Sequence, residues 1–311
     1  MLKLQDSWIW DSWYTFDGEY HHAFYLRASR ALGNPDRRHR HPFIGHAISK
    51  DLKNWQVCAD AIAISDSPAF DSWTTWTGSV IRDDSGKWWM FYTGTSREDS
   101  GDEQRIGAAT SDDLFTWTKI SNRAMVEADP VEYEMLDYNK WHDQAWRDPW
   151  VFKGDDAEWH MLITARANIG DKFSRGVAGH AVSEDLLNWK VLPPLTKPDG
   201  GFGQMEVFQV EEIDGVATLL WCSGPNELTP ELRAKHPYGG MFSVTGESKL
   251  GPFNIQDAVW FPHKSLYAAR VVQHEGKWFM LGFINEVDGE FVGEICDPIE
   301  VKIVGKGLLP A

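Results

Sequence analysis

Cysteine is scarce in this chain of 311 residues, which has only Cys58, Cys222 and Cys296, far apart in the sequence. Without a C-x-x-C pair, a zinc knuckle or a thiol redox motif is not expected. An odd, low cysteine count also provides no disulfide framework of the kind that stabilises small secreted domains. The fold must therefore depend on a hydrophobic core, for which the 42% of hydrophobic residues are sufficient.

Positive charge is also in short supply, because 30 Lys and Arg stand against 46 Asp and Glu, for a formal net charge of −16. Nucleic acids and anionic membranes are bound by clustered Lys and Arg, so neither is expected as a partner. The basic run RRHRH at residues 37–41 is short and isolated, and we interpret it as a solvated loop. No apolar run reaches the ~18 residues that a membrane-spanning helix needs.

Other absences concern the ends and the divisions of the chain. The first residues, MLKLQDSWIW, lack the basic segment, apolar stretch and small-residue cleavage site of a signal peptide, so we expect a cytoplasmic protein. No linker rich in Pro, Gly or Ser divides the sequence, and we expect one domain over residues 1–311. Long amphipathic helices are missing as well, which favours an all-β fold.

What the sequence does contain is a repeat that runs from a Gly-x-Ala strand through Ser-x-Asp-Leu to a Trp. The clear copies are IGHAISKDLKNWQV at 44–57, IGAATSDDLFTWTKI at 106–120 and GHAVSEDLLNWKVL at 179–192. Weaker copies follow at 239–255 and 292–303. Aromatic and β-branched runs bounded by polar turns lie between the copies, and they predict further strands.

Short strands that recur about every 50 to 70 residues are typical of radial repetition. We predict a five-bladed β-propeller, with four-stranded blades around a central funnel and the inner strand first in each blade. Two packed β-sandwiches are the alternative, but they would not explain this repeat. Most of the 17 tryptophans are expected to fill the core between sheets.

Carboxylates fall at similar places in the predicted inner strands, and equivalent residues of such strands face the same axis. Asp11 lies in WIWDSW, Asp148 in AWRDPW and Glu206 in GQMEVFQV, each among apolar neighbours. Ser79 in TWTGSV holds the corresponding place in the second unit, and SLYAARVV at 265–272 holds it in the fifth. The three acids are therefore predicted to converge on one pocket.

Carboxylates that lie close together push their pKa values apart, so that one stays ionised while another keeps its proton. Glycoside cleavage needs this division, since one carboxylate attacks or directs water and an acid protonates the leaving oxygen. Calcium binding is the competing interpretation. Calcium sites usually have closely spaced Asp and Asn in one loop, whereas these acids stand singly, so we expect no metal and no cofactor. Any one of these acids alone could simply cap a turn, and it is their shared phase in the repeat that favours a common site.

Four motifs resemble, in order, those of the five-bladed propeller enzymes that act on fructofuranosides, glycoside hydrolase families 68 and 32. They are Trp-Asp-Ser-Trp at 10–13, Trp-x-Gly-Ser at 76–79, Arg-Asp-Pro at 147–149 and the later Glu206. The first motif is most similar to family 68, the levansucrases and inulosucrases. The resemblance covers nearly the whole chain and implies a retaining enzyme that acts on sucrose or short fructooligosaccharides, by hydrolysis or by fructosyl transfer.

The resemblance also implies roles for individual residues. Asp11 would be the nucleophile that forms a covalent fructosyl-enzyme, and Glu206 would act first as acid and then as base. Asp148 would hydrogen-bond the sugar and stabilise the oxocarbenium-like transition state, and Arg147 would pair with these carboxylates or with the sugar. The other candidates for substrate binding are Trp10, Trp76, Ser79, His142, Gln204, Tyr267 and Arg270.

Other interpretations remain open at this point. Retaining enzymes hold their two carboxyl groups ~5–5.5 Å apart and inverting enzymes ~6.5–9.5 Å, and we expect the shorter separation for Asp11 and Glu206. Gln204 stands where related enzymes often have an acid, which leaves the substrate preference open. Family 43, which cleaves α-L-arabinofuranosides or β-xylosides with the same order of acids, is the runner-up. A sugar-binding propeller without catalysis is less favoured, because burying three carboxylates is costly.

Overall fold

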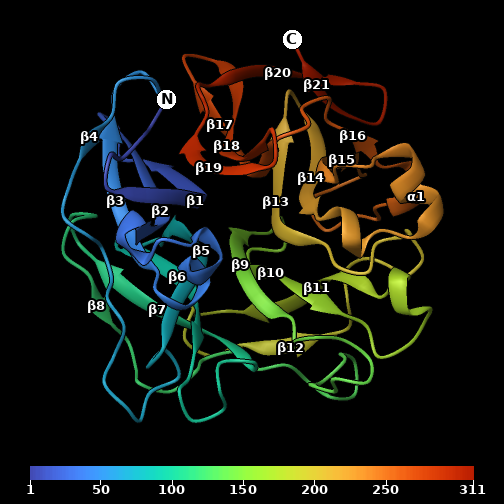
Figure 1. The fold of residues 1–311 in the computed structure, drawn as a ribbon, viewed down its shortest axis with the longest axis horizontal. Coiled ribbons are helices and arrows are strands. Elements are labelled where there is room, and N and C mark those ends of the chain that lie inside the picture. Colours follow the sequence, from blue (N-terminus) through green and yellow to red (C-terminus); the bar gives the residue numbers. More distant parts are fainter.

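The computed structural model describes residues 1–311 and consists of five antiparallel sheets around a central axis (Figure 1). The first blade is β1 (Ser7–Phe16), β2 (His21–Ser29), β3 (Phe43–Ser49) and β4 (Gln56–Val57). The second is β5 (Thr74–Arg82), β6 (Trp88–Thr95), β7 (Gln104–Ser111) and β8 (Thr118–Lys119). The third is β9 (Trp146–Lys153), β10 (Trp159–Arg166), β11 (Gly176–Ser183) and β12 (Lys190–Leu192). The fourth is β13 (Glu206–Ile213), β14 (Val216–Ser223), β15 (Gly240–Thr245) and β16 (Val259–Trp260).

The last blade is built from β17 (Leu266–His274), β18 (Lys277–Val287), β20 (Ile299–Val304) and β21 (Gly307–Pro310), with β19 (Glu290–Ile295) as an extra strand on β18. Helix is limited to α1 (Pro230–Lys235) and the 3₁₀ turns η1 (Arg30–Leu32), η2 (Pro35–Arg40), η3 (Lys172–Ser174), η4 (Pro225–Glu227) and η5 (Ile255–Asp257). The predicted five-bladed β-propeller is confirmed, and the inner strand comes first in every blade as expected. No helix has the length and apolarity that crossing a membrane requires.

The ring closes without the exchange of a strand, because each blade is one continuous stretch of chain. The N-terminal segment instead lies against the last blade, where Leu2 and Ile295 exchange two backbone hydrogen bonds of 3.1 and 3.0 Å. Beside them, Lys3 forms an ion pair with Glu294 at 2.5 Å. These contacts join the two ends of the ring and hold the first inner strand in place.

The repeated Ser-x-Asp-Leu-x-x-Trp motif forms a capped turn after the third strand of a blade. In the third copy, Asp185 accepts hydrogen bonds from the backbone N–H groups of Leu187 and Asn188 at 2.9 and 2.8 Å. Leu186 has a left-handed backbone with φ 66°, and Trp189 Nε1 donates to the Leu186 carbonyl at 3.0 Å. The other two copies make the same contacts. The repeat is therefore structural, which explains why it has no part in the pocket.

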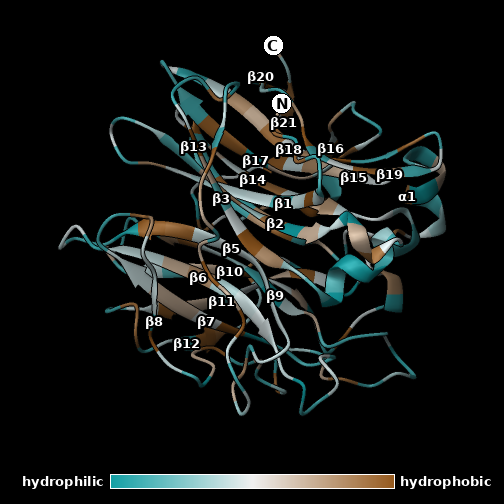
Figure 2. Ribbon diagram, turned by 60° about the vertical axis from the view of Figure 1, so that its left-hand side comes forward, coloured by the Kyte–Doolittle hydropathy of each residue, from teal (hydrophilic) through white to brown (hydrophobic).

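Apolar residues gather in the strands, and polar residues lie in the connecting loops and on α1 (Figure 2). The largest fully buried side chains include Trp13, Trp146 and Trp221, which fill the space between neighbouring sheets. This packing places five inner strands side by side around the axis, and it is these strands that position the site.

Histidine pairs stand within or between the blades. Ring nitrogens are 2.9 Å apart in the buried pairs His22–His46 and His160–His180, and 3.0 Å apart in the partly buried pair His21–His274. Burial lowers the pKa of His46 to about 3 and that of His180 to about 4. Below pH ~6.5 the unfolded chain binds a proton at each such histidine, whereas the folded chain does not until the pH is far lower. These histidines therefore stabilise the fold fully above pH ~6.5 and less as the pH falls.

We expect a His46→Gln variant to approach the wild-type stability as the pH is lowered from ~6.5 to ~4, by up to about 1.4 kcal/mol per pH unit. The variant loses the packing of the ring at every pH, but it no longer carries the cost of keeping a buried histidine neutral. Urea unfolding of both proteins at several pH values measures this difference. A stability difference that stays constant across the range would contradict the expectation.

Candidate active site

A cavity of about 540 Å³ opens at one end of the central axis and is lined by residues from all five blades. Its floor is formed by the inner strands, and its rim by residues 38–40 in η2, residues 142–143, and Gly224, Pro225 and Glu227 at η4. The volume lies within the ~300–1000 Å³ that is usual for small-ligand pockets. The cavity is therefore the natural place for a sugar to bind.

Every inner strand has a β-bulge where it passes the cavity. The irregularities fall at Asp11 in β1, Thr77 in β5, Asp148 in β9, Val207 in β13 and Ala268 in β17. A bulge adds one residue to a strand, bends it and re-aims a side chain. Asp148, Val207 and Ala268 also have positive φ angles of 58°, 55° and 44°, each at a cost of order 1–3 kcal/mol. Bulges therefore occur in all five inner strands, and strained backbone occurs in three of them. This distribution indicates that the whole ring, and not one blade, is shaped around the cavity.

Asp11 projects from the bulge of β1 and accepts a hydrogen bond from the hydroxyl of Thr77. Burial raises the pKa of the Asp11 carboxyl, the Thr77 hydrogen bond opposes this rise, and the charge of Glu206 adds to it. A buried carboxylate has little hydration to lose before it attacks an electrophile. The Asp11 carboxyl thus faces the cavity with a raised pKa and a hydrogen bond from Thr77.

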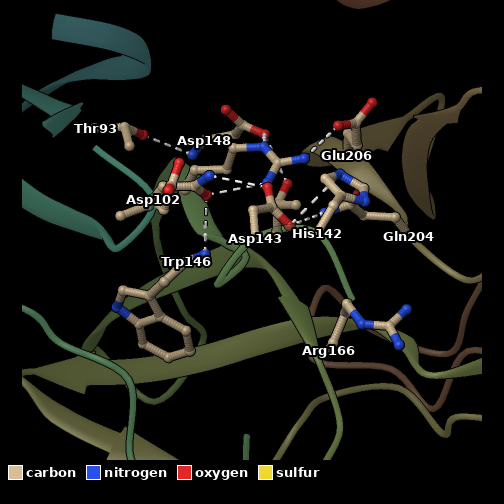
Figure 3. Close-up of polar contacts among 12 residues, drawn as sticks. Thr93, Asp102, His142, Asp143, Trp146, Asp148, Arg166, Gln204 and Glu206 are labelled. Atoms are coloured by element: carbon tan, nitrogen blue, oxygen red, sulfur yellow. Dashed lines mark hydrogen bonds and ion pairs between the residues drawn. The ribbon is translucent and has the colours of Figure 1, made fainter. Parts of the chain in front are cut away.

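Arg147 joins the remaining carboxylates (Figure 3). Its Nη1 lies 3.0 Å from Asp143 Oδ2, its Nε lies 3.4 Å from Asp148 Oδ2, and its Nη2 contacts Glu206 Oε1. Asp148 also accepts a hydrogen bond of 2.8 Å from Thr164 Oγ1. Burial raises the pKa of Asp148 to about 7, Arg147 opposes the rise, and the neighbouring carboxylates add to it. One arginine therefore holds three acids at defined positions around the cavity.

Glu206 begins β13 and is held at both of its carboxyl oxygens. Arg147 binds Oε1, and the hydroxyl of Tyr267 donates to Oε2 at 2.5 Å. Burial raises the pKa of Tyr267 well above its ordinary value, so this hydroxyl keeps its proton. Next to it, burial and the charge of Glu206 raise the pKa of Glu227 to about 8. Glu206 is therefore fixed in a carboxylate-rich corner of the cavity, beside Glu227.

The structure brings most of the predicted site residues to the cavity wall: Trp10, Asp11, Trp76, His142, Arg147, Asp148, Glu206 and Tyr267. Gln204 lies behind the wall. In the amide orientation that satisfies its neighbours, its nitrogen donates to Glu227 Oε1 at 3.1 Å and its oxygen accepts from Arg147 at 3.0 and 3.2 Å. Gln204 thus supports the arginine rather than reaching a ligand.

Arg270, another candidate for substrate binding, is also absent from the cavity wall. It is buried beneath the cavity, where Nη1 donates to the Val207 carbonyl at 3.2 Å and the guanidinium lies 4.8 Å from the centre of the Trp150 ring. Its bond to the strained residue Val207 shows its role, which is to brace the bulge of β13 from below.

Ser79 does not line the cavity, in contrast to the expectation from the repeat. It is 1% exposed, and its Oγ accepts a hydrogen bond of 3.1 Å from the Val151 backbone N–H, which links β5 to β9. Thr77, two residues earlier, takes the place beside Asp11. Counting along the repeat assigned the wrong residue because the bulge turns Thr77 toward the axis and leaves Ser79 facing the next inner strand.

The basic run at 37–41 is not the solvated loop that we expected. It forms most of η2, and Arg38, His39 and Arg40 line the cavity. Arg40 pairs with Asp102 at 3.0 Å, and Arg38 is only 9% exposed, with its guanidinium 3.9 Å from the centre of the Phe291 ring. The only signal in the sequence was the clustering of cations in an otherwise acidic chain.

Other cavity residues that the sequence did not point to are Thr77, Gln104, Asp143, Glu227 and Asn285. Asp143 accepts hydrogen bonds of 3.0 Å from both Gln104 and Arg147, so it completes the ion-pair network. Most of these residues come from loops or strand ends, where no periodic pattern marks them.

Paired carboxylates from separate strands, facing a cavity of sugar size, define the class of the glycoside hydrolases. Residues 8–292 match the model of the glycosyl hydrolases family 32 N-terminal domain, and the chain belongs to this family. The resemblance to fructofuranoside-active propeller enzymes, inferred from the four motifs, is confirmed.

Among characterised relatives, the chain is 24% identical to the extracellular sucrase of Zymomonas mobilis, over 99% of this chain and 82% of that protein. It is 28% identical to the sucrose-6-phosphate hydrolase of Bacillus subtilis, over 55% of this chain and 31% of that protein. The inulosucrase from Halalkalicoccus jeotgali bound to kestose superposes with a TM-score of 0.80 at 20% identity, over 99% of this chain and 90% of that one. Bacillus subtilis levansucrase gives 0.77 at 16%, over 99% and 86%. These structural matches establish the fold.

The expectation of a cytoplasmic protein is wrong. The relative from Zymomonas mobilis, which matches nearly the whole chain, is an extracellular sucrase and points to a secreted protein. The expectation failed because it relied on the composition of the first residues alone, which says nothing of the compartment in which a related enzyme works.

Proposed function

We propose that the protein is a retaining glycoside hydrolase that cleaves β-fructofuranosides such as sucrose or short fructooligosaccharides, with fructosyl transfer as a second outcome. The observation that carries the proposal is the meeting of Asp11 and Glu206, from the first and fourth blades, in one cavity with Asp148 and Arg147. The family and the sucrase relative support the substrate class. Because all five blades line the cavity, we propose that residues 1–311 act as one catalytic domain.

In the first step, the Asp11 carboxylate attacks the anomeric carbon of the fructosyl unit, and the bond to the leaving oxygen breaks. The Glu206 carboxyl gives its proton to that oxygen, so the leaving sugar departs as an alcohol. A covalent ester between Asp11 and the fructosyl unit remains. Positive charge develops on the sugar ring during this step, and the Asp148 carboxylate, held by Arg147 and Thr164, stabilises it.

In the second step, the Glu206 carboxylate takes a proton from water or from a sugar hydroxyl, which attacks the anomeric carbon and releases Asp11. Arg147 and Tyr267 keep Glu206 in position through both steps. Two inversions at one carbon give net retention of the β configuration. Whether the acceptor is water or a sugar decides between hydrolysis and transfer.

The test is product analysis after incubation with sucrose, and in parallel with an aryl α-L-arabinofuranoside. Free glucose from sucrose is expected, with equal fructose if the enzyme hydrolyses and less fructose if it transfers. NMR of the earliest product should show the β anomer. Release from the arabinofuranoside alone would favour the family 43 alternative, and no release from either substrate would contradict the proposed activity.

A further inference from the structure

The turn between β9 and β10 brings together three side chains that can bind a metal ion: Asp156, Glu158 and His160. One ligand atom of each lies within 4.8 Å of the other two. His160 Nε2 is 3.1 Å from both carboxyl oxygens of Asp156. Neighbouring ligands in a tetrahedral zinc site are about 3.4 Å apart, because the bonds are about 2.1 Å long. None of the three residues lines the cavity, so the proposed reaction makes no use of them.

His160 is held in the orientation that a metal ligand needs. It is only 3% exposed, and its Nδ1 lies 2.9 Å from His180 Nε2. A proton on Nδ1 can be donated to His180, which leaves the lone pair of Nε2 facing Asp156. Histidines that bind metals are usually fixed in this way through their second nitrogen. The His160 ring therefore does not have to move to bind an ion.

Gly154 makes room for this arrangement at the start of the turn. A Cβ atom at this position would lie 2.5 Å from Asp156 Oδ1 and 2.7 Å from His160 Nε2. These distances are far below ordinary contact, so any side chain here would push the two ligand atoms apart. The glycine therefore leaves open the space in which the carboxylate and the imidazole meet.

The first two blades balance charge at the corresponding end of the hairpin. The residue before the second strand of a blade lies opposite the residue that follows Ser in the repeated motif. In the first blade these residues are Tyr20 and Lys50, whose Nζ lies 4.7 Å from the tyrosine ring centre and 3.0 Å from Glu19. In the second blade they are Lys87 and Asp112, which form an ion pair at 3.1 Å. Each of these blades therefore has a lysine with an acidic partner.

The third blade has two acids at this place. Trp159 pairs with Ser183, so Glu158 and Glu184 lie opposite each other across β10 and β11. Like charges at opposed positions destabilise a sheet, and neither glutamate forms an ion pair with a basic residue. The positive charge that the other two blades carry is thus missing beside Asp156 and His160. A bound cation would supply it.

The ligand types indicate which cation fits. Calcium and magnesium prefer oxygen ligands alone, whereas an imidazole nitrogen with two carboxylates suits zinc and the similar divalent ions of the first transition row. Three protein ligands leave one position of a tetrahedral site for water. Asp156 has a side chain that is 44% exposed, so an ion can enter from solvent.

We propose that Asp156, Glu158 and His160 form a binding site for one zinc-type divalent ion, which stabilises the third blade at its β9–β10 turn. The ion would relieve the repulsion between Glu158 and Glu184 and tie the turn to the buried His160. This inference is independent of the proposed function, because the site touches no residue of the cavity.

The test is calorimetric titration of zinc chloride into the full chain after treatment with a chelator. The wild type should bind one ion at this site, and an excess of calcium should not displace it. Glu158→Gln and His160→Gln, which remove a ligand, should each weaken zinc binding at least tenfold. Glu184→Lys, which restores the lysine of the first blade, should weaken it about 10- to 100-fold, the usual effect of changing a residue next to the ligands.

Glu19→Gln is the matched control, because Glu19 is an exposed acid in the corresponding turn of the first blade and already has Lys50 as its partner. It should keep the zinc affinity of the wild type. Zinc should also raise the unfolding temperature of the wild type and of Glu19→Gln, but not that of Glu158→Gln, since an ion that binds only the folded chain stabilises it.

Two results would overturn the site. One is a wild type that binds no zinc at millimolar concentration. The other is an equal zinc affinity in the wild type, Glu158→Gln and Glu184→Lys, which would place the bound ion elsewhere on the protein. Because Glu184 is exposed and Glu158 is half-buried, both variants should fold even if His160→Gln does not.

Discussion

Asp11→Asn is expected to abolish turnover of sucrose, with kcat falling on the order of 10⁴-fold or more, as when a covalent nucleophile is removed. The amide is a poor nucleophile and cannot form the fructosyl ester. It keeps the shape of the carboxyl and can still accept the hydrogen bond from Thr77, so the cavity should retain its form. Steady-state release of glucose measures the loss.

The same variant should still bind sugar, with a Kd close to that of the wild type, since Asp11 acts on the reacting carbon rather than on the ground state of the substrate. Calorimetry with sucrose measures this. Asp84→Asn, at an exposed turn in the second blade where the carboxylate pairs with Lys153, is the matched control and should keep full turnover. Undiminished turnover in Asp11→Asn would show that the nucleophile is another residue.

Glu206→Gln should lower kcat for sucrose about 10²- to 10⁴-fold, the usual effect of losing a general acid. The defect should depend on the leaving group. A β-fructofuranoside of an acidic phenol needs no proton to leave, so its first step should be nearly spared, while release of the fructosyl unit is slow because no base activates water. The covalent intermediate should then accumulate and appear in the mass spectrum as an added fructosyl unit.

Glu212→Gln is the matched control for this experiment, because Glu212 is an exposed glutamate on the same strand, β13. It should leave both substrates unaffected. Equal losses in the rate of the first step, measured as the initial burst of released phenol and of released glucose, would contradict the acid role of Glu206 and favour a purely positional one.

The propeller could be predicted because its evidence is local and repeated. The Ser-x-Asp-Leu-x-x-Trp turn is made within one short segment, where Asp185 caps its own chain and Trp189 bonds to Leu186, so the same letters recur wherever the turn recurs. The number of blades then follows from counting the apolar strands between these turns. Asp11 and Glu206 stood out for a similar reason, as single charges among apolar neighbours on strands that had to be buried.

The remaining parts of the site depend on contacts between residues far apart in the chain. Whether Thr77 or Ser79 faces the axis was decided by the bulge in β5, and bulges depend on how one strand pairs with its neighbour rather than on its own composition. Arg38 reached the cavity wall because Phe291, from the last blade, covers it. Arg270 lies beneath the cavity because its guanidinium donates a hydrogen bond to a backbone carbonyl of the strained strand β13. Patterns along the chain predict which residues are buried and how often they recur. The orientation of each side chain in the site is set only when all five blades close into a ring, because the packing partners that fix this orientation come from other blades.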